Sequence, residues 1–155
     1  MWQDNQLRLF SRNKELAHDG LGWVSKFAID VDLESKLKKF GHNIVLQGEL
    51  IGPKIQNNPY GLQKHTVKFF NLFLLPKIIN PDFLDLKSTI TDMGLDFVPI
   101  IDSDYTLPES RSKIIDLANG PSLLHSFVPR EGLVCRTCKG PYFSFKVISN
   151  AWLLK

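Results

Sequence analysis

The sequence contains little that would place the protein outside the cytosol. Its 155 residues include only two cysteines, too few for a framework of disulfide bonds. No apolar run approaches the ~20 residues that a helix needs to cross a bilayer. The N-terminal residues Met1 to Asn5 have no basic head followed by an apolar segment, which argues against a secretory signal. We therefore expect a cytoplasmic protein with no membrane-spanning segment.

Several common catalytic motifs are also missing. The sequence has no Gly-x-x-x-x-Gly-Lys phosphate loop and no Gly-x-Ser-x-Gly nucleophile turn. Cys135 and Cys138 have the spacing of a metal-binding or redox pair. A zinc site would need two more ligands, for which His65 and His125 are candidates, and a redox pair would open a helix. Because the cysteines fall in a predicted hairpin, neither interpretation is favoured, and Cys135 is expected to be a small buried strand residue.

Charge is distributed unevenly along the chain. Residues 1–80 hold 11 basic and 7 acidic side chains, residues 81–117 hold 3 and 8, and residues 118–155 hold 5 and 1. Two basic segments therefore flank an acidic one, although the net charge of the whole chain is only +3. Such blocks are either solvated faces of the protein or the surface that meets a phosphate-rich partner.

The spacing of apolar residues predicts a mixture of helices and strands. Helices are expected where apolar residues recur every three or four positions before a glycine, and strands where they alternate or form short runs. The predicted helices cover residues 23–40, 84–93 and 108–117, and the predicted strands cover residues 6–12, 43–50, 67–75, 96–101, 133–137 and 142–148. Because the two kinds of element do not alternate strictly, we predict an α+β fold with antiparallel sheets, in a single domain over residues 1–155.

The first predicted strand begins close to Met1 and has no earlier strand with which to pair. An isolated edge strand is a poor beginning for a sheet. We therefore expect the domain to be truncated at its N-terminus.

A carboxylate between glycines is the clearest candidate for a binding group. Glu49 lies in Gln47-Gly48-Glu49-Leu50-Ile51-Gly52, at the end of a predicted strand and before a turn rich in Pro and Asn. Glycines let another group approach the backbone closely, and a carboxylate there can accept hydrogen bonds from ribose hydroxyls or hold a metal ion. The competing interpretation is a solvated loop glutamate, which the surrounding glycines and Pro53 make less favourable.

Three more charged residues offer groups that bind phosphates or metals. Arg12 follows the first predicted strand and suits bidentate contacts with phosphate, although most arginines simply lie on the surface. Glu131 opens a strand and offers one carboxylate to Mg²⁺, although it can equally be a strand terminator. Lys146 interrupts an apolar strand, where it is costly to bury unless it faces a ligand or solvent.

Three phenylalanines, Phe69, Phe70 and Phe73, lie in the predicted strand over residues 67–75. Aromatic residues in strands usually pack in the core, and we expect two of these three to do so.

Taken in order, these segments resemble the motifs of the ATP-dependent RNA ligases, a family of covalent nucleotidyltransferases. No single segment is specific, but the colinear series over residues 7–155 is. The resemblance implies a ligase-type nucleotidyltransferase domain, with two antiparallel sheets and flanking helices around an AMP site. The matching segments are Ser11-Arg12-Asn13, Gly48-Glu49-Leu50, the phenylalanine-rich strand, Arg130-Glu131-Gly132-Leu133-Val134, and residues 144–150.

The resemblance also implies roles for these residues. Arg12 would lie in the active site, and Glu49 would contact the nucleoside of ATP. Phe73 would stack on adenine, with Phe70 as the second choice.

The implied reaction joins the 5′-phosphate end of a nicked or broken RNA to a 3′-hydroxyl end. ATP supplies AMP, which is held first on a lysine of the enzyme and then on the RNA. In this scheme Glu131 would engage the catalytic Mg²⁺ or Mn²⁺, and Lys146 would contact the α-phosphate. The implied partners are therefore RNA ends, ATP and a divalent metal ion.

The sequence departs from the family at the first step. The family's Lys-x-Asp-Gly motif, whose lysine accepts AMP, occurs nowhere in the chain, and no lysine precedes Ser11. Many nucleotidyltransferases have two lysines in the last motif, where only Lys146 stands here, and Leu74-Leu75 follows Phe73 where many relatives have Asp-Ile or Asn-Ile. We therefore expect that the isolated chain does not adenylylate itself and that a separate N-terminal segment supplies the motif.

Two alternatives remain from the sequence. The first is a binding module that holds nucleotide or RNA ends without catalysis, as a degenerate or split ligase fragment. The second, less favoured, is a DNA ligase or capping-type nucleotidyltransferase.

Overall fold

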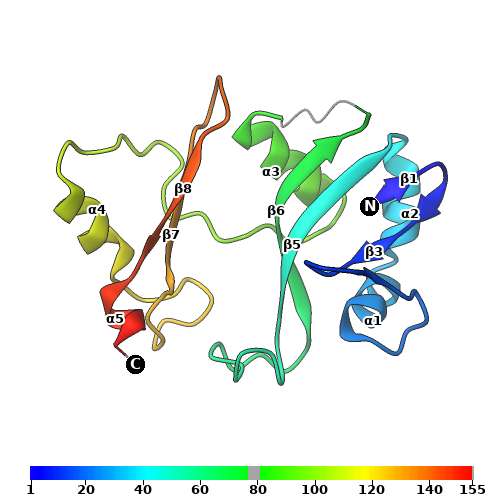
Figure 1. The fold of residues 1–155 in the computed structure, drawn as a ribbon, viewed down its shortest axis with the longest axis horizontal. Coiled ribbons are helices and arrows are strands. Elements are labelled where there is room, and N and C mark those ends of the chain that lie inside the picture. The colour runs from blue at the N-terminus through cyan, green and yellow to red at the C-terminus, as the bar shows by residue number, and fades with distance from the viewer. Residues whose placement is uncertain (77–80, 155) are drawn as a thin grey trace. The chain divides into compact units, whose positions relative to one another are not determined.

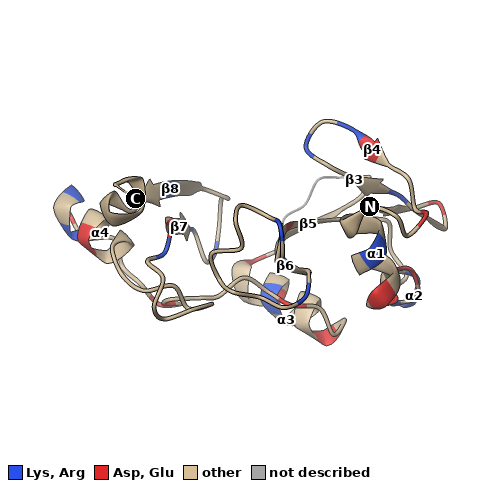
Figure 2. Ribbon diagram, turned by 90° about the horizontal axis from the view of Figure 1, so that it is seen from below, with Lys and Arg blue, Asp and Glu red and all other residues tan. Residues whose placement is uncertain are grey.

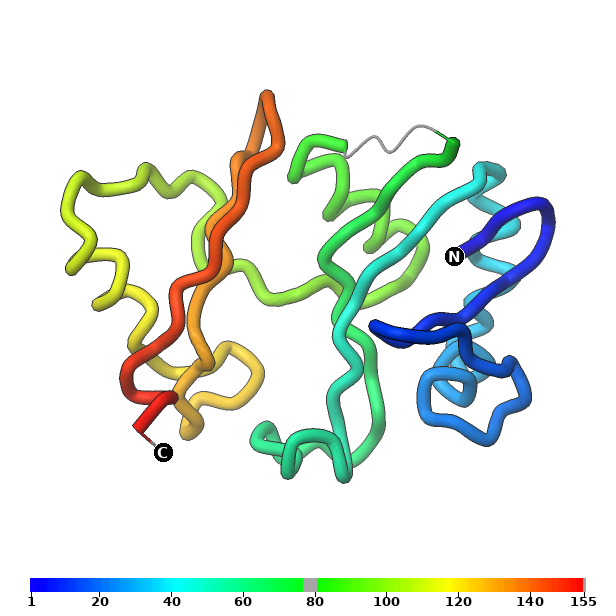
Figure 3. Tube along the Cα trace, viewed as in Figure 1, coloured from blue at the N-terminus to red at the C-terminus, as the bar shows by residue number. Residues whose placement is uncertain are grey.

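The computed structural model describes residues 1–76 and 81–154, which divide into two compact units. The first comprises Met1–Asn58 with Leu62–Val98, and the second comprises Pro59–Gly61 with Pro99–Lys155. The path of the chain through each unit can be followed by colour in Figure 3. The single domain expected over residues 1–155 stays a prediction.

The first unit is built on a four-stranded antiparallel sheet, in the order β2-β1-β5-β6 (Figure 1). A separate two-stranded sheet pairs β3 with β4, and three helices complete the unit. The elements are β1 Trp2–Gln3, β2 Gln6–Leu7, β3 Leu9–Phe10, β4 Glu15–Leu16, α1 Trp23–Asp30, α2 Leu33–Phe40, β5 Ile44–Ile51, β6 Thr66–Leu74 and α3 Phe83–Asp92.

One face of β5 and β6 is buried against the helices of this unit. Alternate strand residues point to this face, and the helices add apolar residues spaced three or four apart. Removing this apolar surface from water is the main favourable term in folding. The core residues are Trp2, Leu7, Leu9, Phe27, Ala28, Leu33, Leu37, Ile44, Val67, Phe69, Leu72, Leu86, Ile90 and Leu95.

The helix ends follow the predicted stop signals. Gly41, after α2, has φ +80, and Gly94, after α3, has φ +65, which is the left-handed region that residues with a Cβ seldom adopt. The helix predicted over residues 23–40 is interrupted, because Asp32 adopts φ 50 between α1 and α2. The apolar residues change phase at this break, because on a continuous helix Phe27 and Ala28 would lie on one face and Leu33 and Leu37 on roughly the opposite face.

Three predictions about strands are wrong. The strand expected over residues 6–12 is divided into β2, which pairs with β1, and β3, which pairs with β4. The first predicted strand is not isolated, because its first part, β2, pairs with β1, which also pairs with β5. The strand β1 was missed because it is too short to show an alternating pattern. The strand expected over residues 96–101 is reduced to one bridge, in which Phe97 lies beside Phe69.

The second unit consists of a helix, a hairpin and a short C-terminal helix. The hairpin of β7 and β8 forms where it is predicted, with antiparallel pairing throughout. The helix begins at Arg111 instead of residue 108, and the last helix is not predicted from the sequence. The elements are α4 Arg111–Ala118, β7 Gly132–Arg136, β8 Ser144–Ile148 and α5 Asn150–Leu153.

The predicted α+β class with antiparallel sheets and flanking helices is confirmed by these elements. Among the described residues, no helix has the length and apolar character that crossing a membrane requires.

Candidate functional site

The predicted site residues fall into two groups. Arg12, Glu49 and Phe73 belong to the first unit, and Glu131 and Lys146 belong to the second. Each group has its own geometry.

Glu49 and Phe73 lie on the same face of the four-stranded sheet. Residues directly opposite each other on neighbouring strands share a face, and Glu49 pairs with Lys68 while Phe73 pairs with Val45. Core residues such as Leu72 occupy the other face. The sheet therefore presents an exposed carboxylate and a half-buried aromatic ring on the side away from its helices.

Gly48 is required by the sheet itself. The register passes from Asn71 opposite Gln47 to Phe69 opposite Gly48, which makes a bulge in the pairing. A Cβ on Gly48 would lie 2.5 Å from Val67 Cγ1, so the group that approaches this glycine closely is β6 and not a ligand. Two expectations are therefore corrected: the glycine does not mark a ligand contact, and Glu49 lies within β5 instead of at a strand end.

The aromatic residues of β6 are less buried than expected. Only Phe69 lies in the core, where 5% of its surface is exposed, and both Phe70 and Phe73 are half-buried. The bulge explains the difference, because the extra residue shifts the alternation of the strand between Phe69 and Leu72. Both candidates for base stacking are therefore accessible.

A hydrogen-bonded pair of amides, which the sequence analysis did not identify, lies between Glu49 and Phe73 on this face of the sheet. Asn71 Nδ2 donates a hydrogen bond to Gln47 Oε1 at 2.9 Å across the strands. Two single amides far apart in the sequence give no local signal, so only the register of β5 and β6 reveals the pair.

Arg12 lies at the tip of the hairpin formed by β3 and β4. Ser11 N donates to Lys14 O at 2.8 Å, which closes the turn. The Arg12 side chain is exposed and has no hydrogen bond or ion pair among the residues that the structure describes. Figure 2 shows this turn on the side of the sheet opposite the helices α1, α2 and α3. The turn that carries Arg12 is therefore on the same side of the sheet as Glu49 and Phe73.

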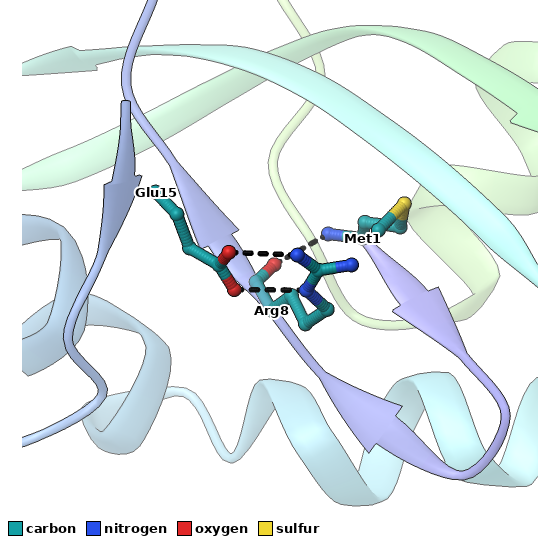
Figure 4. A network of polar contacts seen from close by, with 3 residues as sticks. All are labelled: Met1, Arg8 and Glu15. Carbon is teal, nitrogen blue, oxygen red and sulfur yellow. Dashed lines mark hydrogen bonds and ion pairs between the residues drawn. The ribbon is translucent and has the colours of Figure 1, made fainter. Parts of the chain in front are cut away.

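The hairpin that carries Arg12 is held by an ion pair (Figure 4). Arg8 Nε and Nη2 donate to the two carboxylate oxygens of Glu15 at 2.8 and 2.7 Å, and the ammonium of Met1 donates to Arg8 O at 2.8 Å. The hydrogen bonds from Arg8 lower the pKa of the Glu15 carboxyl. Burial, with a smaller effect from the Arg8 charge, lowers the pKa of the Met1 amine.

The contribution of this ion pair to stability should disappear in acid. Because the pKa of Glu15 is lower in the folded chain than the ordinary value of 4.5, the pair stabilises the fold above that value, and the contribution is lost as the pH falls through the folded-state pKa. Glu15→Gln should lower the thermal midpoint at neutral pH and leave it unchanged well below the folded-state pKa. Asp30→Asn, which removes the exposed ion pair with Lys26, is the matched control. An equal loss from Glu15→Gln at both pH values would contradict this account.

Glu131 and Lys146 form an ion pair at one end of the second unit's hairpin. Lys146 lies opposite Val134, and Gly132 lies opposite Ile148. Glu131 immediately precedes Gly132 and therefore lies close to the lysine. Both side chains are accessible, with 49% of Lys146 and 40% of Glu131 exposed. A cation and a carboxylate thus lie side by side at the surface, where one can meet a phosphate and the other a metal ion.

A hydrogen-bond network that the sequence did not reveal fixes this end of the hairpin. Ser149 is fully buried, and its N–H donates to Glu131 O at 2.8 Å. The Ser149 hydroxyl donates to Asn119 Oδ1 at 2.9 Å. The Asn119 side chain therefore ties the end of α4 to the residue after β8.

The described residues contain no cluster of three or more His, Cys, Asp and Glu side chains that could hold a metal ion. The zinc interpretation of Cys135 and Cys138 is therefore left without a site. Cys135 is partly buried, and burial raises the pKa of its thiol, which disfavours the reactive thiolate. Cys138 is exposed, and its Sγ contacts Ser103 O at 3.5 Å.

The chain is similar to known RNA ligases in sequence and in structure. A profile of the RNA ligase family matches residues 1–148. Substituted forms of Naegleria gruberi RNA ligase, one solved with AMP and manganese and one with ATP and manganese, are 31% identical to this chain, with a TM-score of 0.90. A structure of the same ligase with pyrophosphate has the same identity and TM-score.

These alignments cover 98% of this chain and 46% of the Naegleria chain, so the chain spans about half the length of those structures. No curated protein matches.

Proposed function

Because the chain belongs to the RNA ligase family, we propose that it binds ATP or AMP with a divalent metal ion, together with RNA ends, and serves the joining of a 5′-phosphate to a 3′-hydroxyl. This is the chemistry of RNA repair. The observation that carries the proposal is the accessible ion pair of Lys146 and Glu131, which supplies a phosphate-binding cation beside a metal-binding carboxylate.

The first unit has side chains that suit a nucleotide. Phe73 offers a half-exposed ring for stacking on adenine, and Glu49 offers an acceptor for ribose hydroxyls. Arg12, in the turn between β3 and β4 on the same side of the sheet, suits a phosphate. All three belong to positions at which the sequence resembles the family.

The second unit has side chains that suit the phosphates and their metal ion. Mg²⁺ and Mn²⁺ are commonly held by one or two carboxylates together with substrate phosphates, so Glu131 alone is a fitting protein ligand. A bound metal ion would neutralise charge on the phosphate oxygens. Lys146 and Glu131 neutralise each other in their ion pair. Lys146 would be the group to contact the α-phosphate of a bound nucleotide, and Glu131 would be the group to hold the metal ion.

The first step of the family reaction needs a lysine that this sequence does not supply, since Lys-x-Asp-Gly is absent from it. We propose that the isolated chain does not form its own AMP adduct. The remaining capacity is the final step, in which a 3′-hydroxyl displaces AMP from RNA that has already been activated. A separate segment carrying the motif would complete the reaction.

A non-catalytic binding module is the second candidate. The absence of the nucleophile favours it, because a degenerate ligase keeps its nucleotide and RNA contacts after losing chemistry. The two candidates differ at Glu131, which catalysis requires and simple binding does not.

Nucleotide binding tests the proposal without requiring catalysis. Phe73→Ala should weaken the binding of AMP with Mn²⁺ about tenfold, the loss expected when one base loses an aromatic stacking partner. Titration calorimetry on the full chain measures the affinity. Phe70→Ala, on the same strand and also partly buried, is the matched control, and should stay within about twofold of the unaltered protein. If Phe70→Ala weakened binding and Phe73→Ala did not, the assignment of the stacking ring would be wrong.

A further inference from the structure

The hairpin of β7 and β8 presents one exposed face that runs from Lys146 towards its turn. Lys146 pairs with Val134, and Ser144 pairs with Arg136, so these four residues share a face. Leu133, one position away, points to the other face and is buried, whereas 65% of Val134 is exposed. Figure 1 shows the turn at the end of the hairpin opposite α5.

Tyr142 extends this face beyond the paired strands. Its hydroxyl lies 3.1 Å from Ser144 Oγ, and Arg136 Nη2 lies 3.3 Å from the same hydroxyl. The Arg136 guanidinium carbon lies 5.2 Å from the centre of the tyrosine ring, within the range of a cation–π contact. Even so, 49% of Tyr142 is exposed. An accessible aromatic ring and a guanidinium group therefore occur together, in line with Lys146.

The backbone around the turn is fixed before any ligand binds. Thr137 N donates to Phe143 O at 3.0 Å, and Phe143 N donates to Thr137 Oγ1 at 3.1 Å. The same hydroxyl donates to Pro141 O at 3.0 Å. Little conformational entropy is then lost when a ligand contacts the ring, which favours binding.

The charge of the hairpin indicates the kind of ligand. Residues 130–146 contain four basic residues and one acidic residue, Glu131, which is itself paired with Lys146. Basic side chains beside an exposed ring are the combination that binds single-stranded nucleic acid, because phosphates meet the cations and a base stacks on the ring. A duplex keeps its bases stacked inside and cannot use the ring in this way.

We propose that this face of the hairpin is a binding site for single-stranded RNA, in which a base stacks on Tyr142 and an adjacent phosphate contacts Arg136. Tyr142 precedes Lys146 by four positions along the chain, about 13 Å at ~3.3 Å per residue for an extended backbone. The site therefore lies a short distance from Lys146, for which a contact with the α-phosphate is proposed. The inference rests on the proposed function, because that function makes RNA ends the substrate.

Fluorescence anisotropy with a labelled, unstructured RNA oligonucleotide and the full chain tests this site. Tyr142→Ala should weaken binding about tenfold, the loss of one stacked base, whereas Tyr142→Phe should retain the affinity. Tyr142→Leu keeps apolar bulk without an aromatic ring and should behave like Tyr142→Ala, which separates stacking from the folding of the turn. Phe143→Ala is the matched control, since Phe143 is also exposed but contacts Phe145 on the other face.

The salt dependence of binding tests the phosphate contact. Arg136→Ala should reduce the slope of log affinity against log salt by about one. The proposal is overturned if Tyr142→Leu binds RNA as tightly as the unaltered protein, if Phe143→Ala loses as much affinity as Tyr142→Ala, or if duplex RNA shows the same sensitivity to these changes.

The binding of AMP with Mn²⁺ distinguishes failure of this inference from failure of the proposed function. If the Tyr142 variants bind RNA normally while Phe73→Ala loses AMP, only the RNA site on the hairpin is wrong. If the unaltered, folded chain binds neither AMP nor RNA, the proposed function fails and this inference fails with it.

Discussion

Gly132→Ala should destabilise the second unit by about 3 kcal/mol and separate Glu131 from Lys146. A Cβ at this position would lie 2.0 Å from Val147 O and 3.0 Å from Ile148 Cα, which is impossible without moving one strand away from the other. Inserting atoms into a closely packed site costs about 1–3 kcal/mol, and sometimes more, and here the obstacle is backbone. The thermal midpoint should fall by about 5–10 °C.

Gly140→Ala is the matched control for this substitution. Gly140 lies in the turn of the same hairpin with φ +83, and a Cβ there would meet nothing within 4 Å. Alanine at this position carries only the cost of a left-handed backbone, about 1–2 kcal/mol. Thermal unfolding followed by circular dichroism compares the two variants. The close approach of the strands at Gly132 would be contradicted if both variants lost the same stability.

Lys146→Ala should slow the joining of pre-adenylylated RNA at least about a hundredfold. Lys146 is proposed to stabilise charge on the α-phosphate as AMP leaves, and removing one such donor costs about 10²–10³ in rate. Glu131→Ala should have a similar effect, because Glu131 is the proposed protein ligand of the metal ion. Neither change should unfold the protein, since an exposed ion pair contributes about 1 kcal/mol or less.

Lys139→Ala is the matched control, because it removes an exposed lysine from the same hairpin and away from Glu131. Single-turnover kinetics with saturating RNA separate the chemical step from binding. A pure binding module would give a different result. It would lose RNA affinity with Lys146→Ala in a salt-dependent manner and tolerate Glu131→Ala.

The elements with strong local signals could be predicted from the sequence. The strands β5 and β6 follow apolar patterns, and Gly41 and Gly94 end helices because their backbone is left-handed. The break at Asp32 was missed, although the apolar residues change phase there, between Phe27 and Ala28 on one side and Leu33 and Leu37 on the other. The strand expected over residues 96–101 has the right composition but pairs only at Phe97.

For the candidate site, the sequence was enough to select the residues but not to show how they are arranged. Lys146 and Glu131 were selected by motif order, but their ion pair depends on the register of β7 and β8, which no local pattern specifies. The role of Ser149 could not be predicted either, because a buried serine is recognised only from its partners, Glu131 and Asn119. Gly48 was selected for the wrong reason, since it accommodates β6.

The joining of a pre-adenylylated RNA donor to a 3′-hydroxyl acceptor, with Mg²⁺ and without ATP, tests the central claim most directly. The assay bypasses the lysine that the sequence lacks, and it is carried out on protein first shown to be folded. We expect sealed product, lost in Glu131→Ala, and no product when the donor is a 5′-phosphate RNA supplied with ATP. No sealed product from the folded chain would contradict the ligase account and leave the binding module in its place.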